Sequence, residues 1–173
     1  ISNLDDVFRL DKGQLITITG VPNCGKSEFV DFYTSVLNKL YGLKTLYFSP
    51  ENQPCELHVS KLVSKFTNKP WEKLTQAEID VAIDYICKNF FFCNYDKIKS
   101  LNDIEELVVK TISDTPFDIL VIDSYNKVEW DRPANETETD FISKVLDKLC
   151  EMAIALNIIC SNRAISPSKK HLL

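Results

Sequence analysis

Residues 20–27 have the types and spacing of a loop that binds the phosphates of a nucleotide. Two glycines lie five positions apart, and the second is followed directly by Lys26 and Ser27, which fits the pattern G-x-x-x-x-G-K-[ST]. Backbone N–H groups of such a loop converge on the phosphates, the lysine reaches the β- and γ-phosphates, and the serine hydroxyl binds Mg²⁺. The predicted nucleotide-binding residues are Gly20, Val21, Pro22, Asn23, Cys24, Gly25, Lys26, Ser27 and Glu28.

The residues on either side of this loop predict the strand and helix that the chemistry needs. Residues 14–19 are predicted to form a buried β-strand, and residues 27–41 an amphipathic helix whose N-terminus adds the positive end of its dipole. The apolar face of this helix is expected to contain Phe29, Val30, Tyr33, Val36, Leu37 and Leu40, with Gly42 as its C-terminal cap. The alternative, a glycine-containing turn with a surface lysine, does not need this frame. We therefore expect the chain to bind a nucleoside triphosphate.

Asp123 is the predicted second ligand of the magnesium ion. Four apolar residues, 119–122, precede it and predict a central strand that is buried on both faces. Ligands of open α/β sheets bind at the carboxyl ends of the strands, where Asp123 would lie. The alternative is an ordinary strand that ends in a turn aspartate, and the phosphate loop upstream favours the metal site.

Glu51 follows another predicted strand and is the candidate for activating a water molecule. A carboxylate at that edge of the sheet is placed to orient and deprotonate the water that attacks the γ-phosphate. The alternative is a glutamate after Pro50 that is stabilised by the dipole of the following helix. The spacing alone does not separate the two interpretations.

Strands and helices are expected to alternate along one compact α/β domain that spans residues 1–173. The further predicted strands are 44–49, 90–93, 117–122 and 158–161, and the further predicted helices are about 54–66, 75–89, 101–113 and 136–156. A capping-box pattern, Thr75 to Glu78, opens the second of these helices. This alternation predicts right-handed crossovers and a mostly parallel sheet, followed by a loose tail over residues 163–173.

The composition limits the classes of function that the chain can have. A net charge of −5 argues against a broadly basic surface that coats nucleic acid, and no segment has the pattern of a membrane span or a signal peptide. The six cysteines are scattered, and several fall within apolar segments, so they are interpreted as small buried residues in a reducing compartment inside the cell. Cys24 is interpreted as a tolerated small residue, and the alternative is a thiol whose alkylation blocks nucleotide entry. Because the sequence begins without methionine, we expect a fragment of a longer protein.

Three segments together resemble the RecA-like motor domain of DnaB-family replicative helicases, and most closely its Twinkle and phage primase-helicase branch. They are residues 19–29, 48–52 and 121–126, supported by residues 132–139. The resemblance implies a three-layer P-loop fold and a hexameric ATPase that uses ATP and Mg²⁺ to translocate on single-stranded DNA. It also implies a primase domain upstream, and it favours catalytic roles for Lys26, Glu51 and Asp123.

The chain departs from the family pattern in two places. Asn162 stands where the family usually has a histidine or glutamine that senses the γ-phosphate. The family's last strands, which carry an arginine finger, have no counterpart in the sequence. These departures keep open a degenerate or truncated nucleotide-binding or regulatory module. A small-molecule kinase is the other alternative, but arginine occurs only at positions 9, 132 and 163, too few for an arginine-rich lid.

Two further features have a structural interpretation that we prefer to a functional one. Residues 127–132 contain Lys127, Trp130 and Arg132, which would contact phosphates and stack on a base if this loop bound DNA. The alternative is a solvated loop with Trp130 folded back onto the domain. His58 and His171 have no partners at ligand spacing, so zinc is not expected, and His58 is predicted to decorate the surface of its helix.

Overall fold

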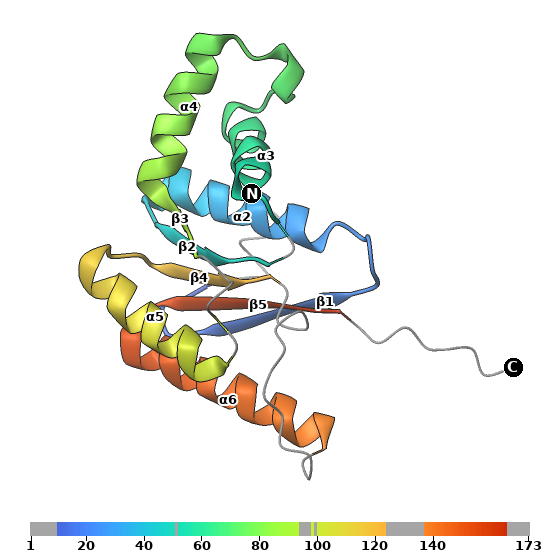
Figure 1. Ribbon diagram of the computed structural model, residues 1–173, viewed down its shortest axis with the longest axis vertical. Coiled ribbons are helices and arrows are strands. Elements are labelled where there is room, and N and C mark those ends of the chain that lie inside the picture. Colours follow the sequence, from blue (N-terminus) through green and yellow to red (C-terminus); the bar gives the residue numbers. More distant parts are fainter. Residues whose placement is uncertain (1–9, 51, 94–97, 99, 124–136, 166–173) are drawn as a thin grey trace, which may run out of the picture.

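Parallel strands form one sheet at the centre of the computed structural model, and helices cover both of its faces (Figure 1). The structure describes residues 10–50, 52–93, 98, 100–123 and 137–165, and of residues 162–165 only the backbone. The described strands are β1 (Leu15–Gly20), β2 (Thr45–Phe48), β3 (Phe90–Phe92), β4 (Ile119–Ile122) and β5 (Ile159–Ile165). The described helices are α2 (Lys26–Tyr41), α3 (Cys55–Thr67), α4 (Gln76–Asn89), α5 (Leu101–Asp114) and α6 (Glu138–Leu156), with a short 3-10 helix at Trp71–Lys73.

In the strand order β1-β5-β4-β2-β3, β4, which leads to Asp123, lies at the centre of the sheet, and β2 lies beside it. β1, which leads to the phosphate loop, is an edge strand. Every described pairing is parallel, which confirms the predicted α/β class. β5, the last of the described strands in sequence, lies between β1 and β4 and pairs with both. Because these strands are parallel, the carboxyl ends of β1, β5, β4 and β2 lie at the same edge of the sheet.

β5 is longer than the sequence pattern predicted. It was expected to end at Ser161, but it continues to Ile165, which lies opposite Gly20 of β1. Residues 163–165 thus belong to the sheet and not to a loose tail. Residues 161–163 are polar, so the hydrophobic pattern does not predict this extension. Backbone pairing with β1 holds these residues in the strand.

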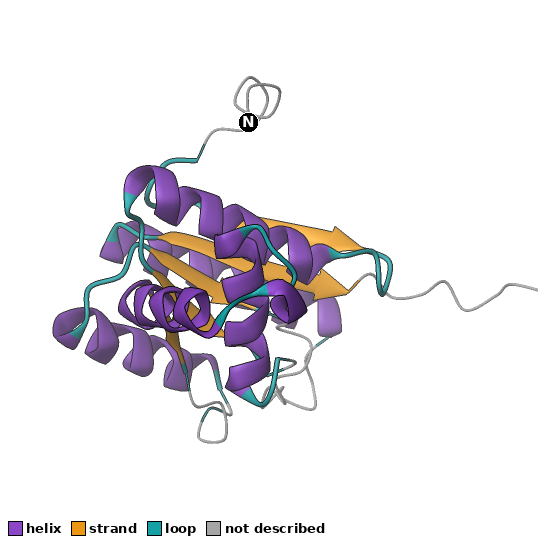
Figure 2. Cartoon of the chain, turned by 90° about the horizontal axis from the view of Figure 1, so that it is seen from above, coloured by secondary structure: helices purple, strands orange, loops and turns teal. Residues whose placement is uncertain are grey.

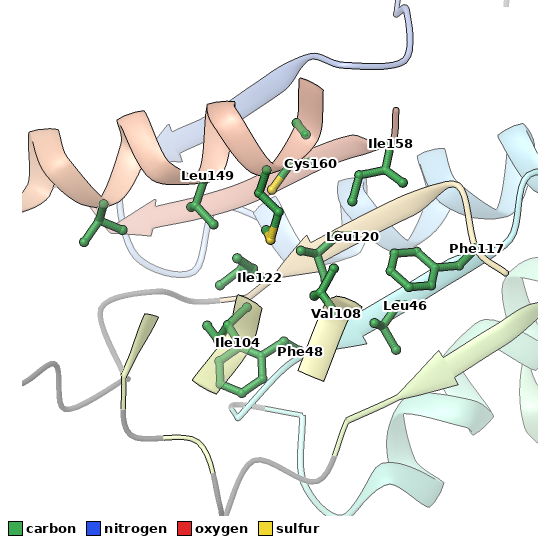
Figure 3. Close-up of a cluster of buried hydrophobic side chains, with 13 residues drawn as sticks. Leu46, Phe48, Ile104, Val108, Phe117, Leu120, Ile122, Leu149, Ile158 and Cys160 are labelled. Atoms are coloured by element: carbon green, nitrogen blue, oxygen red, sulfur yellow. The ribbon is translucent and has the colours of Figure 1, made fainter. Parts of the chain in front are cut away.

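Alternate side chains of β4 enter two separate cores. Leu120 and Ile122 pack under α5 and α6 in the first cluster, where Leu149 and Val108 are fully buried (Figure 3). Ile119 and Val121 face the second cluster, on the side of α2, α3 and α4. Viewed from above, the sheet lies between these two helical layers (Figure 2). A strand buried on both faces is the arrangement that its continuous apolar run predicted.

The buried face of α2 differs from the predicted one. Phe29 and Leu40 were expected in the core, but their side chains are 42 % and 64 % exposed. The helix instead buries Val30 and Leu37 together with several polar residues, namely Lys26, Asp31, Thr34, Ser35 and Asn38. These polar groups have partners across the interface: Asn38, for example, donates to the Leu43 carbonyl and accepts from Tyr85. Hydrogen bonding therefore allows α2 to bury polar residues on a face that the apolar pattern of the sequence does not indicate.

Two predicted helix ends are confirmed. Gly42 adopts a left-handed conformation (φ 70°) and its N–H donates to the Asn38 carbonyl at 2.8 Å, so it caps the C-terminus of α2. At the start of α4, the Thr75 hydroxyl accepts from the backbone N–H of Glu78, whose carboxylate accepts from the backbone N–H of Thr75. Among the described helices, none is both long and apolar enough to cross a bilayer.

The capping box should make α4 sensitive to acid. The hydrogen bond from Lys69 and those from Thr75 lower the pKa of Glu78 from 4.5 to about 2. Because this pKa is depressed in the folded state, the carboxylate stabilises the fold above about pH 4.5, and the contribution is lost as the pH falls toward 2. We expect Glu78→Gln to lower the melting temperature at pH 7 and to change it little near pH 2. Melting curves across this range test this, with Glu106→Gln on α5 as the control; an equal loss at every pH would contradict it.

Candidate nucleotide-binding site

The phosphate loop connects the end of β1 directly to the start of α2. β1 ends at Gly20 and α2 begins at Lys26, so the strand–loop–helix frame is confirmed. Gly25 caps the helix with φ 83°, and Asn23 also has a positive φ of 60°. Such left-handed residues turn successive N–H groups toward one side of a loop and form an anion-binding concavity. Val21 is 65 % exposed, so the loop is open to solvent.

Lys26 points into the loop and not away from the domain. Its side chain is only 7 % exposed, and Nζ donates to the carbonyls of Gly20 at 2.9 Å and Val21 at 2.6 Å. A surface lysine would not be buried against its own loop, so the interpretation as an ordinary turn is disfavoured. Phosphate oxygens are stronger acceptors than carbonyls, and they would replace them as partners of the ammonium group.

Gly20 packs closely against the side chains of its own loop. A Cβ atom there would lie 3.2 Å from Sγ of Cys24 and in ordinary contact with Cδ of Lys26, at 3.6 Å. A side chain at position 20 would therefore have to displace the Cys24 sulfur slightly. The shape of the loop and its N–H and ammonium donors fit the phosphates of a nucleoside triphosphate.

Asp123 lies directly after β4 at the same edge of the sheet. Its backbone N–H donates to the Phe48 carbonyl of β2 at 2.9 Å, and its side chain is 3 % exposed. The alternation of β4 directs the side chain toward the face covered by α2, where its charge contributes to the raised pKa of Tyr47. One strand separates β4 from β1, so their axes are about 10 Å apart. A buried carboxylate at this place fits a magnesium ion held between it and Ser27.

Several predicted site residues lie outside what the structure describes. Glu51 and the loop with Lys127, Trp130 and Arg132 are among these residues, and so is the side chain of Asn162. The backbone of Asn162 lies inside β5, opposite Thr17 and Ile122, and not after the strand as expected. The roles of these residues remain predictions.

The turn around Glu51 is described on both sides. β2 ends at Phe48, and the buried Ser49 accepts a hydrogen bond from Nδ2 of Asn52 at 2.8 Å. Lys61 of α3 donates to Oδ1 of Asn52 at 3.2 Å. Ser49 thus lies at the carboxyl end of β2, next to Asp123, and Asn52 is tied to α3.

Glu28 has a partner that the sequence did not indicate. Its exposed carboxylate forms an ion pair with Lys65 of α3. Because the carboxylate is paired, the backbone N–H of Glu28, in the first turn of α2, is the group that would make the predicted contact with the nucleotide.

His58 is buried, contrary to the prediction that it decorates the surface. Its side chain is 1 % exposed, and Nε2 lies 2.9 Å from Oδ1 of Asp31 on α2. The sequence contained no signal for this pair, because the two residues are 27 positions apart and belong to different helices. In the described part of the chain, no group of three potential ligands is arranged to hold a metal.

An apolar cavity of about 420 Å³ lies between α2 and the strands β1 and β5. Its lining includes Ile16, Ile18, Val30, Tyr33 and Leu37. Such a lining does not suit phosphate or Mg²⁺, so the cavity is separate from the charged part of the site.

The cysteines provide a test of where the nucleotide binds. Burial raises the pKa of Cys93 and, with a contribution from Cys150, that of Cys160 to about 12, whereas Cys24 and Cys87 are exposed. We expect a thiol reagent at pH 8 to label Cys24 and Cys87 first, and saturating MgATP to slow the labelling of Cys24 alone. Mass spectrometry of the labelled peptides measures this. Equal protection of Cys87, or none of Cys24, would place the nucleotide elsewhere.

Comparison with known proteins agrees with the fold and the loop. The chain is 30 % identical over 158 residues to a Twinkle homolog protein, chloroplastic/mitochondrial, from Arabidopsis thaliana, covering 85 % of this chain and 22 % of that protein. The chain thus spans about a fifth of the length of this relative. No family model matches the chain.

Solved structures share the architecture at low sequence identity. One solved ATPase domain superimposes with a TM-score of 0.72 at 18 % identity, covering 92 % of this chain and 60 % of that chain. A DnaB-like replicative helicase, studied with its interactions with primase, gives 0.74 at 18 %, with 94 % and 42 % covered. A KaiC-like protein from Pyrococcus horikoshii gives 0.61 at 16 %, with 91 % and 63 % covered. The chain therefore has the RecA-like P-loop fold of these ATPase domains, and its sequence is similar to that of the Twinkle homolog.

Proposed function

We propose that the chain is the ATP-binding and hydrolysing motor domain of a replicative DNA helicase that translocates on single-stranded DNA. The observation that carries the proposal is the burial of Lys26 inside a phosphate loop whose sheet edge also bears Asp123. A phosphate loop alone indicates only triphosphate binding. The buried carboxylate of Asp123 at the same edge is the further part that a Mg²⁺-dependent phosphoryl transfer requires.

The residues have separate tasks in this proposal. Loop N–H groups and Lys26 bind the phosphates, and the hydroxyl of Ser27 and the carboxylate of Asp123 would hold Mg²⁺, which when bound would neutralise charge on the phosphates. Glu51 orients the attacking water and accepts its proton. Asn162 donates a hydrogen bond toward the γ-phosphate. Water is the proposed acceptor because a kinase would need an acceptor site and an arginine-rich lid.

The proposed partners rest on the family resemblance of the sequence. A hexameric ring is proposed for the full-length protein, with a primase domain upstream in the same chain and single-stranded DNA in the channel. A cation from the neighbouring subunit would complete the site, and such an arginine finger contributes roughly 10³–10⁵ in rate. The proposed location is inside the cell, in the replication compartment of an organelle or a phage or in the cytoplasm.

Unwinding of a forked DNA duplex by the full-length protein tests this proposal. We expect strand separation with MgATP and none with a non-hydrolysable ATP analogue. A nucleotide-binding regulatory module, favoured by the unusual Asn162, predicts ATP binding without unwinding in either condition. Transfer of phosphate to a nucleoside in the same reaction would favour the kinase.

A further inference from the structure

Asp31 and His58 form a buried polar pair between the phosphate-loop helix and the next helix. Nε2 of His58 lies 2.9 Å from Oδ1 of Asp31, and the two side chains are 1 % and 3 % exposed. Nε2 therefore carries the hydrogen that the carboxylate accepts. Tyr47 and Phe92 pack around the imidazole, with ring centroids 4.6 Å and 5.3 Å away. A carboxylate in such an apolar setting is costly to bury unless it is paired.

Stability is a weak explanation for this pair. A buried ionisable pair is often no more stabilising than apolar residues of similar volume, because both groups lose their hydration. The rings of Tyr47 and Phe92 pack around His58, so an apolar side chain would suit the place of the imidazole. The best-supported role of a buried polar pair is to fix the position of one element relative to another.

The elements that the pair connects are the two that carry the proposed chemistry. Asp31 lies four residues after Ser27 on α2, so the two residues share a face of the helix. His58 lies in the first turn of α3, which begins directly after residues 52–54. The hydrogen bond from Lys61 to Asn52 holds these residues to α3. A displacement of α3 would therefore move Asn52 relative to the phosphate loop.

A further contact joins β2 to α2 beside this pair. Tyr47 of β2 has its hydroxyl 2.7 Å from Oγ1 of Thr34 on α2, and burial and the charge of Asp31 raise the pKa of Tyr47. Tyr47 thus stays a neutral hydrogen-bonding group beside the pair. Asp31, His58, Thr34 and Tyr47 form one buried network that joins α2, α3 and the strand leading to Glu51.

We propose that Asp31 and His58 are positioning residues that hold Ser49 and Asn52, which flank Glu51 in the sequence, at a fixed place relative to the phosphate loop. They do not contact the nucleotide; they act through Glu51, so this inference rests on the proposed function. Proximity effects are steep, and a displacement of about 1 Å can cost on the order of 10²-fold in rate. Loss of the pair should therefore lower kcat and leave MgATP binding almost unchanged.

The test uses the full-length protein and a double variant in which the pair is replaced by apolar residues. Asp31→Leu together with His58→Leu removes both polar groups, so no buried charge is left unpaired and the fold should be kept. We expect kcat for ATP hydrolysis to fall about 10- to 100-fold, with the Kd for MgATP and the melting temperature close to those of the wild type. Asp31→Asn, which still accepts from His58, should retain most of kcat.

The controls separate the possible explanations. Lys65→Gln removes the exposed Glu28–Lys65 ion pair, which also joins α2 to α3, and should leave kcat unchanged. Wild-type kcat in the stably folded double variant would overturn the proposal and leave the pair a packing feature. Equal losses of kcat and MgATP affinity would overturn it as well. Glu51→Gln is measured in parallel: full hydrolysis by that variant contradicts the proposed function itself, whereas its loss beside a fully active double variant contradicts only the positioning role.

Discussion

Lys26→Met is expected to weaken MgATP binding by roughly 10- to 150-fold, the equivalent of the 1.5–3 kcal/mol that a hydrogen bond to a charged group contributes. The structure gives the reason: the ammonium group is buried in the loop, within hydrogen-bonding distance of the carbonyls of Gly20 and Val21. Methionine has a similar length and fills the same space but donates no hydrogen bond. Titration calorimetry with MgATP measures the loss.

Lys39→Met is the matched control for this variant. Lys39 lies on the same helix, and its ammonium group donates to the Phe66 carbonyl at the opposite end from the loop. Its removal should leave MgATP affinity within about twofold of the wild type, since it is far from the loop. A similar loss in both variants would mean that α2, and not the phosphate loop, determines the affinity.

Glu51→Gln is expected to lower kcat for ATP hydrolysis by about 10²- to 10⁴-fold, the usual contribution of a positioned general base. Glutamine has the same shape but cannot accept the proton of the attacking water. Because Glu51 is not proposed to hold the phosphates or Mg²⁺, the Kd for MgATP should stay the same. Single-turnover hydrolysis and equilibrium binding, measured on the same preparation, separate the two effects.

The control for Glu51 is the next glutamate along the chain. Glu56 lies in the first turn of α3, where a carboxylate can favour the helix N-terminus without any catalytic role. Glu56→Gln should leave kcat unchanged. If Glu51→Gln also hydrolyses ATP at the wild-type rate, Glu51 is the helix-leading residue of the alternative interpretation.

The sheet and the phosphate loop were predictable because their signals are local. β4 is apolar throughout and is buried on both faces, and the spacing of Gly20, Gly25 and Lys26 reflects backbone requirements within a few residues. Asp123 was located for the same reason, since it directly follows the four apolar residues that form β4.

The features that the sequence did not reveal depend on distant partners. The apolar stripe of α2 misled the prediction, because Phe29 and Leu40 are exposed while Asp31 and Asn38 are buried with partners on other elements. His58 was expected at the surface because periodicity gives no account of a partner 27 residues away. Tertiary hydrogen bonds overrode the hydrophobic pattern in both cases.

ATP hydrolysis by the full-length protein, measured with and without single-stranded DNA, tests the central claim most directly. A motor that translocates on DNA must couple the two ligands, so we predict that saturating single-stranded DNA increases the steady-state rate and that Glu51→Gln abolishes the increase. Hydrolysis at one rate whether or not DNA is present, or stimulation that persists in Glu51→Gln, would contradict this account.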